Sequence, residues 1–175
     1  MQHEALTTRR YLAVFLPLLP AERLFRTHPK ALDAAPDAPF ALIEKERGAM
    51  RLAACNSGAL ALGILPGTAL ADARACVPEL LAFDHDPVAD AKLLDWLADG
   101  CERYTPSCAL HPPYGLLLDI SGCLHLHGHN EAVLARDLKA QFWRQGVSVR
   151  LATGNTPDSA FAKARFRSKM SRHCR

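Results

Sequence analysis

Apolar runs of strand length alternate along the chain with segments whose apolar residues recur every three or four positions. The first pattern is typical of buried β-strands and the second of helices that bury one face. Strands are predicted over residues 11–16, 40–44, 50–54, 107–110, 115–120 and 147–151, with a further short apolar run at 80–83. The polar turn at residues 46–48 predicts a hairpin between the second and third of these strands. Helices are predicted to begin near Ala21, Asp86, Asn130 and Thr156 and at two further caps, Asn56 and Thr68.

Capping residues support two long helices. Asp86 followed by Pro87 is a favourable start, because the aspartate accepts a free helical N–H and proline lacks one. Asn130 can cap the second helix in the same way. The residues expected to face the core from these two segments are Leu93, Leu94, Leu97, Cys101, Tyr104, Leu134, Leu138 and Phe142.

Residues 25–80 interrupt an otherwise simple order of elements. With this segment set aside, the order is strand, helix, strand, strand, helix, strand, which is the split βαβ or ferredoxin-like pattern. Continuous apolar residues at 116–118 indicate that their strand is covered on both faces. The predicted fold class is α+β, a ferredoxin-like platform with a small subdomain inserted after the first strand. Unrelated functions share this platform, so the fold by itself does not identify the function.

The composition is that of an ordinary globular protein. Of 175 residues, 49% are apolar and 22% are charged, which excludes a disordered or fibrous chain. No apolar run approaches the roughly 20 residues of a membrane span, and we expect a soluble, cytoplasmic protein with no membrane partner. The six cysteines are scattered and form no Cys-x-x-Cys pair, which favours reduced thiols over a disulfide framework.

Basic residues exceed acidic ones, 21 to 18, but the excess lies at the C-terminal end. Residues 161–175 contain six basic residues and no acidic one, so residues 1–160 carry a formal charge of −3. The body of the chain is therefore no basic platform for nucleic acid. Lys163 and Arg165 are candidates for contacts with DNA phosphates, although a solvent-exposed basic segment is the simpler interpretation.

Four potential metal ligands occupy alternate positions after the strand 115–120, namely Cys123, His125, His127 and His129. In an extended segment they would point to one side, and thiolate and imidazole suit zinc or copper. Structural zinc sites usually draw on two separate segments, however, and histidines in a solvated loop are common. We therefore predict no metal and no cofactor, and keep as an alternative a metal-binding ferredoxin-like domain that uses Cys123, His125 and His127.

The carboxylates give little sign of catalysis. Asp84 and Asp86 have the spacing to share a divalent ion, but Asp86 is better explained as the helix cap. Asp119 interrupts an apolar strand, and because a buried carboxylate needs a partner, a structural hydrogen-bonded role is favoured. No glycine-rich phosphate loop and no Ser-His-Asp arrangement stands out. We predict no catalytic residue.

Several segments resemble the Y-family translesion DNA polymerases of the UmuC and DinB type, and they follow that family's order. The segments are 10–14 (RYLAV), 61–74 (ALGILPGTALADAR), 115–122 (GLLLDISG), 153–155 (TGN) and 161–163 (FAK). The resemblance covers residue 11 to about residue 165 and implies a palm with inserted fingers.

The resemblance also implies domain boundaries. The palm would comprise residues 11–24 and 81–166, and the fingers residues 25–80. Residues 1–10 would form an N-terminal tail, and residues 167–175 a basic, disordered tail. The thumb, the little finger and the clamp-binding region of the family are expected to be absent.

Two-metal nucleotidyl transfer needs carboxylates, because Mg²⁺ prefers oxygen ligands. When residues are counted along the matched segments, the positions of the family's metal-binding carboxylates hold Phe15, Pro17, Tyr114 and Gly115. The positions of the tyrosine and arginine that hold the incoming triphosphate have Ser57 and Leu60. The chain therefore resembles an inactive branch of the family, and we predict that it is not an enzyme.

The inactive branch implies an accessory role in DNA repair, within bacterial SOS-type translesion mutagenesis. Its expected partners are a replicative-type translesion polymerase, a recombinase-like cassette protein and DNA. A non-functional gene remnant is a further alternative.

Overall fold

A computed structural model describes residues 9–28, 38–128 and 130–166 of the chain. The described residues form two compact units. One comprises residues 9–17 and 94–166, and the other residues 18–93. The predicted basic tail at 167–175 and most of the predicted N-terminal tail lie outside the described residues.

The first unit is built on a four-stranded antiparallel sheet with the strand order β5-β6-β1-β7. Strand β1 is hydrogen-bonded on both sides, and its central residues are fully buried. The strands are β1 (Tyr11–Phe15), β5 (Cys108–His111), β6 (Gly115–Asp119) and β7 (Arg150–Gly154).

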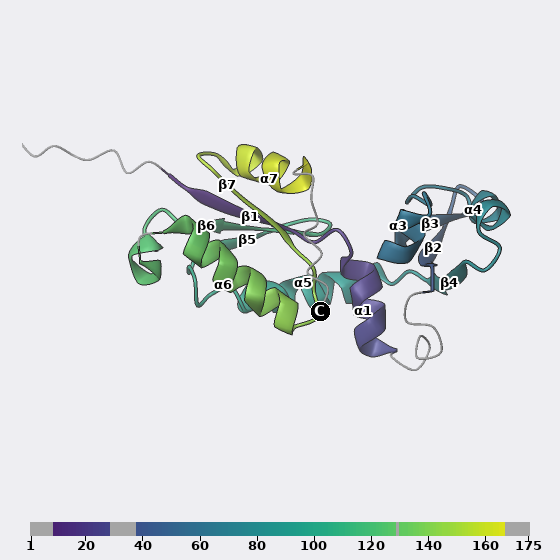
Figure 1. The fold of residues 1–175 in the computed structure, drawn as a ribbon, viewed down its shortest axis with the longest axis horizontal. Coiled ribbons are helices and arrows are strands. Elements are labelled where there is room, and N and C mark those ends of the chain that lie inside the picture. The colour runs from purple at the N-terminus through teal and green to yellow at the C-terminus, as the bar shows by residue number, and fades with distance from the viewer. Residues whose placement is uncertain (1–8, 29–37, 129, 167–175) are drawn as a thin grey trace, which may run out of the picture. The chain divides into compact units, whose positions relative to one another are not determined.

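Helices α6 (Glu131–Arg144) and α7 (Pro157–Phe166) lie on opposite faces of this sheet (Figure 1). As the apolar spacing predicts, α6 buries Leu134, Leu138 and Phe142. Helix α7 packs on β1 and β7 through small residues, which are Ala13, Ala152, Ala160 and Ala164.

The end of α5 (Pro87–Asp99) is tied to α6, because Gln141 donates a hydrogen bond to the Gly100 carbonyl at 2.9 Å. Along the chain, the elements of the platform follow the order β1, α5, β5, β6, α6, β7. This order agrees with the predicted split βαβ pattern.

The second unit contains a three-stranded mixed sheet with the order β3-β2-β4. Strand β2 is antiparallel to β3 and parallel to β4. Its elements are α1 (Leu19–Thr27), β2 (Phe40–Glu46), β3 (Ala49–Cys55), α3 (Ser57–Ala61), α4 (Leu70–Cys76) and β4 (Leu81–Asp84). The predicted hairpin between β2 and β3 is confirmed, and its turn places Arg47 and Gly48 at positive φ.

Buried polar side chains order the second unit. Asn56 accepts hydrogen bonds from the Ala59 and Phe40 N–H groups at 2.9 and 3.0 Å, and so caps α3 as predicted. Asp90 is buried between the Arg23 guanidinium, 2.5 Å away, and His85, 2.9 Å away. Since a buried carboxylate is costly without partners, these contacts fix the first turn of α5 against α1.

The predicted bounds of the last strand are wrong, because β7 spans Arg150–Gly154 and not 147–151. The Val147 N–H donates instead to the Phe142 carbonyl at the end of α6, at 3.0 Å. Gly146 has a φ of 71°, the left-handed conformation that commonly ends a helix. The alternating apolar and polar residues at 147–151 therefore lie partly in the connection after α6 and only partly in β7.

The predicted cap of α4 is also wrong. Its N-cap residue is Ala69, with no side-chain hydrogen bond, and not Thr68. The backbone of Thr68 is used by the hairpin instead, since its carbonyl accepts a hydrogen bond from the Leu52 N–H at 3.0 Å. Among the described residues, no helix is long and apolar enough to cross a membrane.

Candidate functional site

The C-terminal end of β1 brings together most of the positions that sequence analysis assigned to metal-binding carboxylates. Phe15 lies directly opposite Gly115 on β6. The Leu16 N–H donates to the Tyr114 carbonyl at 2.9 Å, which continues the pairing past the strand end. Pro17 follows in the turn after β1. The assignment of these positions to the family's ligands remains a prediction.

Aromatic rings occupy this end of the sheet. The Phe161 ring of α7 stacks on the His111 imidazole with 3.7 Å between centroids. Phe15 meets the same phenylalanine edge to face, with centroids 6.0 Å apart. We call Phe15, His111 and Phe161 the aromatic cluster. Such ring pairs add attraction beyond the apolar area they bury.

Gly115 is required by the aromatic cluster. A Cβ atom at this position would lie 2.5 Å from Phe161 Cζ and 2.9 Å from the His111 carbonyl oxygen. Both distances are shorter than ordinary van der Waals contact. Any side chain at position 115, a carboxylate included, would therefore displace the Phe161 ring.

The chemistry of these side chains does not fit magnesium. The ion takes hard oxygen ligands. Phe15 and Pro17 have hydrocarbon rings, Tyr114 has a neutral phenol, and Gly115 has no side chain. Across the described residues, no group of three His, Cys, Asp or Glu side chains could hold a metal ion.

Ser57 and Leu60, at the positions predicted for triphosphate contacts, belong to the second unit. Both lie on the short helix α3, where Ser57 is exposed and Leu60 is half-buried. Neither side chain carries a positive charge or an aromatic ring.

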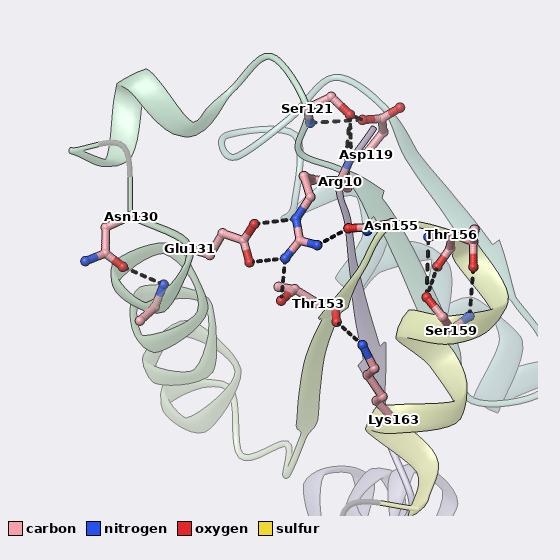
Figure 2. Close-up of polar contacts among 11 residues, drawn as sticks. Arg10, Asp119, Ser121, Asn130, Glu131, Thr153, Asn155, Thr156, Ser159 and Lys163 are labelled. Carbon is pink, nitrogen blue, oxygen red and sulfur yellow. Dashed lines mark hydrogen bonds and ion pairs between the residues drawn. The ribbon is translucent and has the colours of Figure 1, made fainter. Parts of the chain in front are cut away.

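The opposite end of β1 carries a polar network centred on Arg10 (Figure 2). Two guanidinium nitrogens donate to the two Glu131 carboxylate oxygens at 2.6 and 2.7 Å. The same guanidinium donates to Thr153 Oγ1 at 3.2 Å and to Asn155 Oδ1. We call these four residues the Arg10 network. It joins the start of β1, the first turn of α6 and the end of β7.

Asp119 extends the polar end of the sheet. The Ser121 hydroxyl and N–H both donate to its Oδ1, at 2.6 and 3.0 Å. These bonds lower the pKa of Asp119, with the Ser121 hydroxyl as the main cause. The predicted hydrogen bonding of this carboxylate is confirmed, but Asp119 is half-buried and not fully buried. Asp86 likewise caps α5, since it accepts from the Ala89 N–H at 2.9 Å.

Electrostatics hold Glu131 in its ionised form. The hydrogen bond from Arg10 is the main cause that lowers the pKa of Glu131 from its ordinary 4.5, against a smaller opposing effect of burial. Glu131 in turn favours the charged form of its partner, because its hydrogen bond raises the pKa of the Arg10 guanidinium. Arg10 and Glu131 thus form a bidentate ion pair, which acts as a structural clamp between their elements.

The predicted metal-ligand segment is not extended. Residues Leu124–His127 form a single 3₁₀ turn, so alternate residues do not share one side. Cys123 is a half-buried free thiol, and His125 is turned back toward the Gly122 carbonyl, 2.9 Å from its Nδ1. His129 lies outside the described residues, and the side chain of His127 is not described.

The two predicted DNA contacts lie on the exposed side of α7. Lys163 Nζ is 3.5 Å from the Thr153 carbonyl of β7. The Arg165 guanidinium lies over the Phe166 ring, 5.9 Å from its centroid. The side chains of Lys163 and Arg165 are thus both accessible from solvent.

Sequence reasoning did not predict the aromatic cluster or the Arg10 network. Phe161 and Arg10 both fall within the segments that carry the family resemblance, but His111 and Glu131 do not. The sequence did hold one signal for the Arg10 network. Arg10 is a charged residue directly before a buried strand, and such a charge needs a partner. The identity of that partner depends on the sheet register.

Replacement of Gly115 by alanine should destabilise the protein. The added methyl group would force Phe161 or the His111 backbone to move, and we expect a loss of about 1–3 kcal/mol in the free energy of unfolding. Urea denaturation of G115A measures this loss. Gly122→Ala is the matched control, because nothing lies within 4 Å of its Cβ position, and it should change stability by less than about 0.5 kcal/mol. Equal stability of the two variants would contradict the close approach of Phe161.

Replacement of Glu131 by glutamine should remove a pH-dependent contribution to stability. A carboxylate whose pKa is lowered by folding stabilises the folded state above its unfolded pKa, and this contribution is lost as the pH falls through the folded pKa. At neutral pH, the free energy of unfolding of E131Q should be about 1 kcal/mol lower than that of the natural protein. The difference should shrink once the pH falls below about 4.5.

Denaturation of both proteins across this pH range tests the expectation. Glu79→Gln, an exposed glutamate, should show no such difference at any pH. A difference for E131Q that does not depend on pH would refute an electrostatic role.

Comparison with known proteins places these observations in a family context. No protein-family model matches the chain. Over 105 residues, 60% of the chain, it is 45% identical to Protein ImuB from two strains of Caulobacter vibrioides. The chain spans only 23% of the length of these curated relatives.

Solved structures of DNA polymerases share the fold. The post-insertion binary complex of Dbh DNA polymerase has a TM-score of 0.80 at 15% identity, with 91% of this chain and 46% of that chain covered. DinB from Sulfolobus solfataricus has a TM-score of 0.76 at 15% identity, with the same coverage. The chain is thus a homologue of ImuB over 105 residues and has the α+β fold of the N-terminal, palm and fingers half of the Y-family DNA polymerases.

Proposed function

We propose that the chain is a catalytically inactive Y-family polymerase-like protein of the ImuB type, which acts as an accessory module in DNA repair. Its setting would be SOS-type translesion mutagenesis in the bacterial cytoplasm. In this proposal residues 11–24 and 81–166 form the palm, and residues 25–80 form the inserted fingers.

One observation carries the proposal of inactivity. Phe15 and Gly115 face each other at the end of the central strand, and Phe161 fills the space beside them. A two-metal site would need several carboxylates at that point, with room for two ions between them. The aromatic cluster supplies neither the charge nor the space.

The similarity to ImuB supports the accessory role. Partners consistent with it are a replicative-type translesion polymerase, a recombinase-like cassette protein and DNA. The fold would serve as a scaffold for these partners, since a protein can keep a polymerase-like surface without the reaction. Lys163 and Arg165 are the residues we propose for contact with DNA phosphates.

A primer-extension assay tests the proposal of inactivity. With a primer-template duplex, Mg²⁺ and all four deoxynucleoside triphosphates, the chain should add no nucleotide, because no carboxylate set holds the metal. An active Y-family polymerase in parallel reactions verifies the substrate. Template-dependent incorporation that is abolished by Asp119→Asn would overturn the proposal, since it would assign the activity to this chain.

The DNA contacts predict a specific salt dependence. Each phosphate contact contributes about 0.9 to the slope of log binding constant against log salt concentration. Lys163→Ala and Arg165→Ala should therefore each make the slope shallower by about 0.9, which fluorescence anisotropy with a labelled duplex measures. Lys139→Ala, on the exposed side of α6, is the control and should leave the slope unchanged. No binding by the natural chain, or equal slopes for all four proteins, would contradict these contacts.

A further inference from the structure

Two free cysteines lie at the junction between α5 and β5, with six residues between them. Cys101 follows the end of α5 and is fully buried, with 0% of its surface exposed. Cys108 is the first residue of β5 and is half-buried. One thiol of the pair can therefore meet a small solute, whereas the other is shielded from solvent.

The sheet register explains why the two thiols meet. Cys108 pairs with Leu118, and Leu118 pairs in turn with Leu12. Residues directly opposite each other point to the same face of a sheet. Ala13, the neighbour of Leu12, packs against α7, so this row of side chains faces the other side, where α6 and the end of α5 lie. Cys101 is buried on that side.

The two thiols interact with each other. The interaction with Cys101 is the main cause that lowers the pKa of Cys108, against smaller opposing effects of burial, Asp99 and Glu102, and together with burial it raises the pKa of Cys101. Cys101 also lies 3.3 Å from the Leu97 carbonyl. The thiolate is the reactive form of cysteine, so the accessible Cys108 is the nucleophile and the shielded Cys101 the second thiol of the pair.

We propose that Cys101 and Cys108 are a modification site at which a hydroperoxide produces an intramolecular disulfide. The Cys108 thiolate attacks one peroxide oxygen, the O–O bond breaks, and for hydrogen peroxide the leaving hydroxide takes up a proton to become water. Cys108 is then a sulfenic acid. The Cys101 sulfur attacks the Cys108 sulfur, the S–O bond breaks, and the hydroxide and the Cys101 proton leave as a second water. Two thiols lose two electrons, and the peroxide gains them.

The other described cysteines lack these features. Burial raises the pKa of Cys55 to about 11, which leaves it a thiol at neutral pH. Cys76 is exposed, and Cys123 is half-buried. The disulfide would fix the connection 102–107, which already anchors β6 through the Thr105 hydroxyl bond to the Asp119 carbonyl at 2.6 Å.

Peroxide treatment of the purified chain tests the proposal. The folded, reduced protein is exposed to hydrogen peroxide and then unfolded in urea, where its remaining thiols are blocked with N-ethylmaleimide. It is digested without a reductant. Mass spectrometry should find the Cys101 and Cys108 peptides linked and lighter by two hydrogen atoms than the reduced pair. Cys76→Ser is the matched control and should give the same linked peptide.

Two variants make the order of events testable. In Cys101→Ser, the Cys108 sulfenic acid has no partner and should be trapped by dimedone, whereas Cys108→Ser should yield neither a trapped sulfenic acid at position 101 nor a linked peptide. The proposal is overturned if both thiols of the natural chain are blocked by N-ethylmaleimide after peroxide treatment. It is also overturned if Cys108 is oxidised to a sulfonic acid with Cys101 still free. These readouts do not depend on DNA or on a partner protein.

Discussion

Strand β1 is hydrogen-bonded to β6 on one side and to β7 on the other, and this double pairing sets the chemistry at both of its ends. Tyr11 lies opposite Asp119 and Gly154, whereas Phe15 lies opposite Gly115 and Arg150. Because both registers are antiparallel and continuous, a slip of one residue would turn the buried side chains of β1 to the wrong face. The polar Arg10 network and the aromatic cluster are therefore held apart at fixed positions by one strand.

The two ends of the sheet differ in what they contribute. At one end, Arg10 and Glu131 neutralise each other, and the Arg10 network connects three elements, which serves stability. At the other end, a polymerase would hold several carboxylates together, and like charges at close range repel each other unless cations separate them. Aromatic rings at that end carry no such charge and add packing. Replacement of carboxylates by aromatic rings, as in the function we propose, would therefore favour the fold.

Much of this arrangement could be predicted from the sequence. The caps Asn56, Asp86 and Asn130 are local signals, since each accepts an N–H only two or three residues ahead, and all three are confirmed. Strand β7 was misplaced because residues 147–149 alternate like a strand but follow a helix terminus at Gly146. The register of β1, by contrast, depends on pairings a hundred or more residues apart. No local pattern could bring His111 onto Phe161, or Glu131 onto Arg10.

The aromatic cluster depends in turn on how closely α7 approaches the sheet. Ala13, Ala152, Ala160 and Ala164 form the contact, and their short side chains let the helix lie near the strands. A Cβ atom at Gly154 would lie 2.7 Å from the Ala160 N atom, so even one methyl group there would push the start of α7 outward. Phe161 is the next residue along that helix. Its contacts with Phe15 and His111 therefore follow from small residues several positions away, and the same spacing that permits the fold also closes the space beside Gly115.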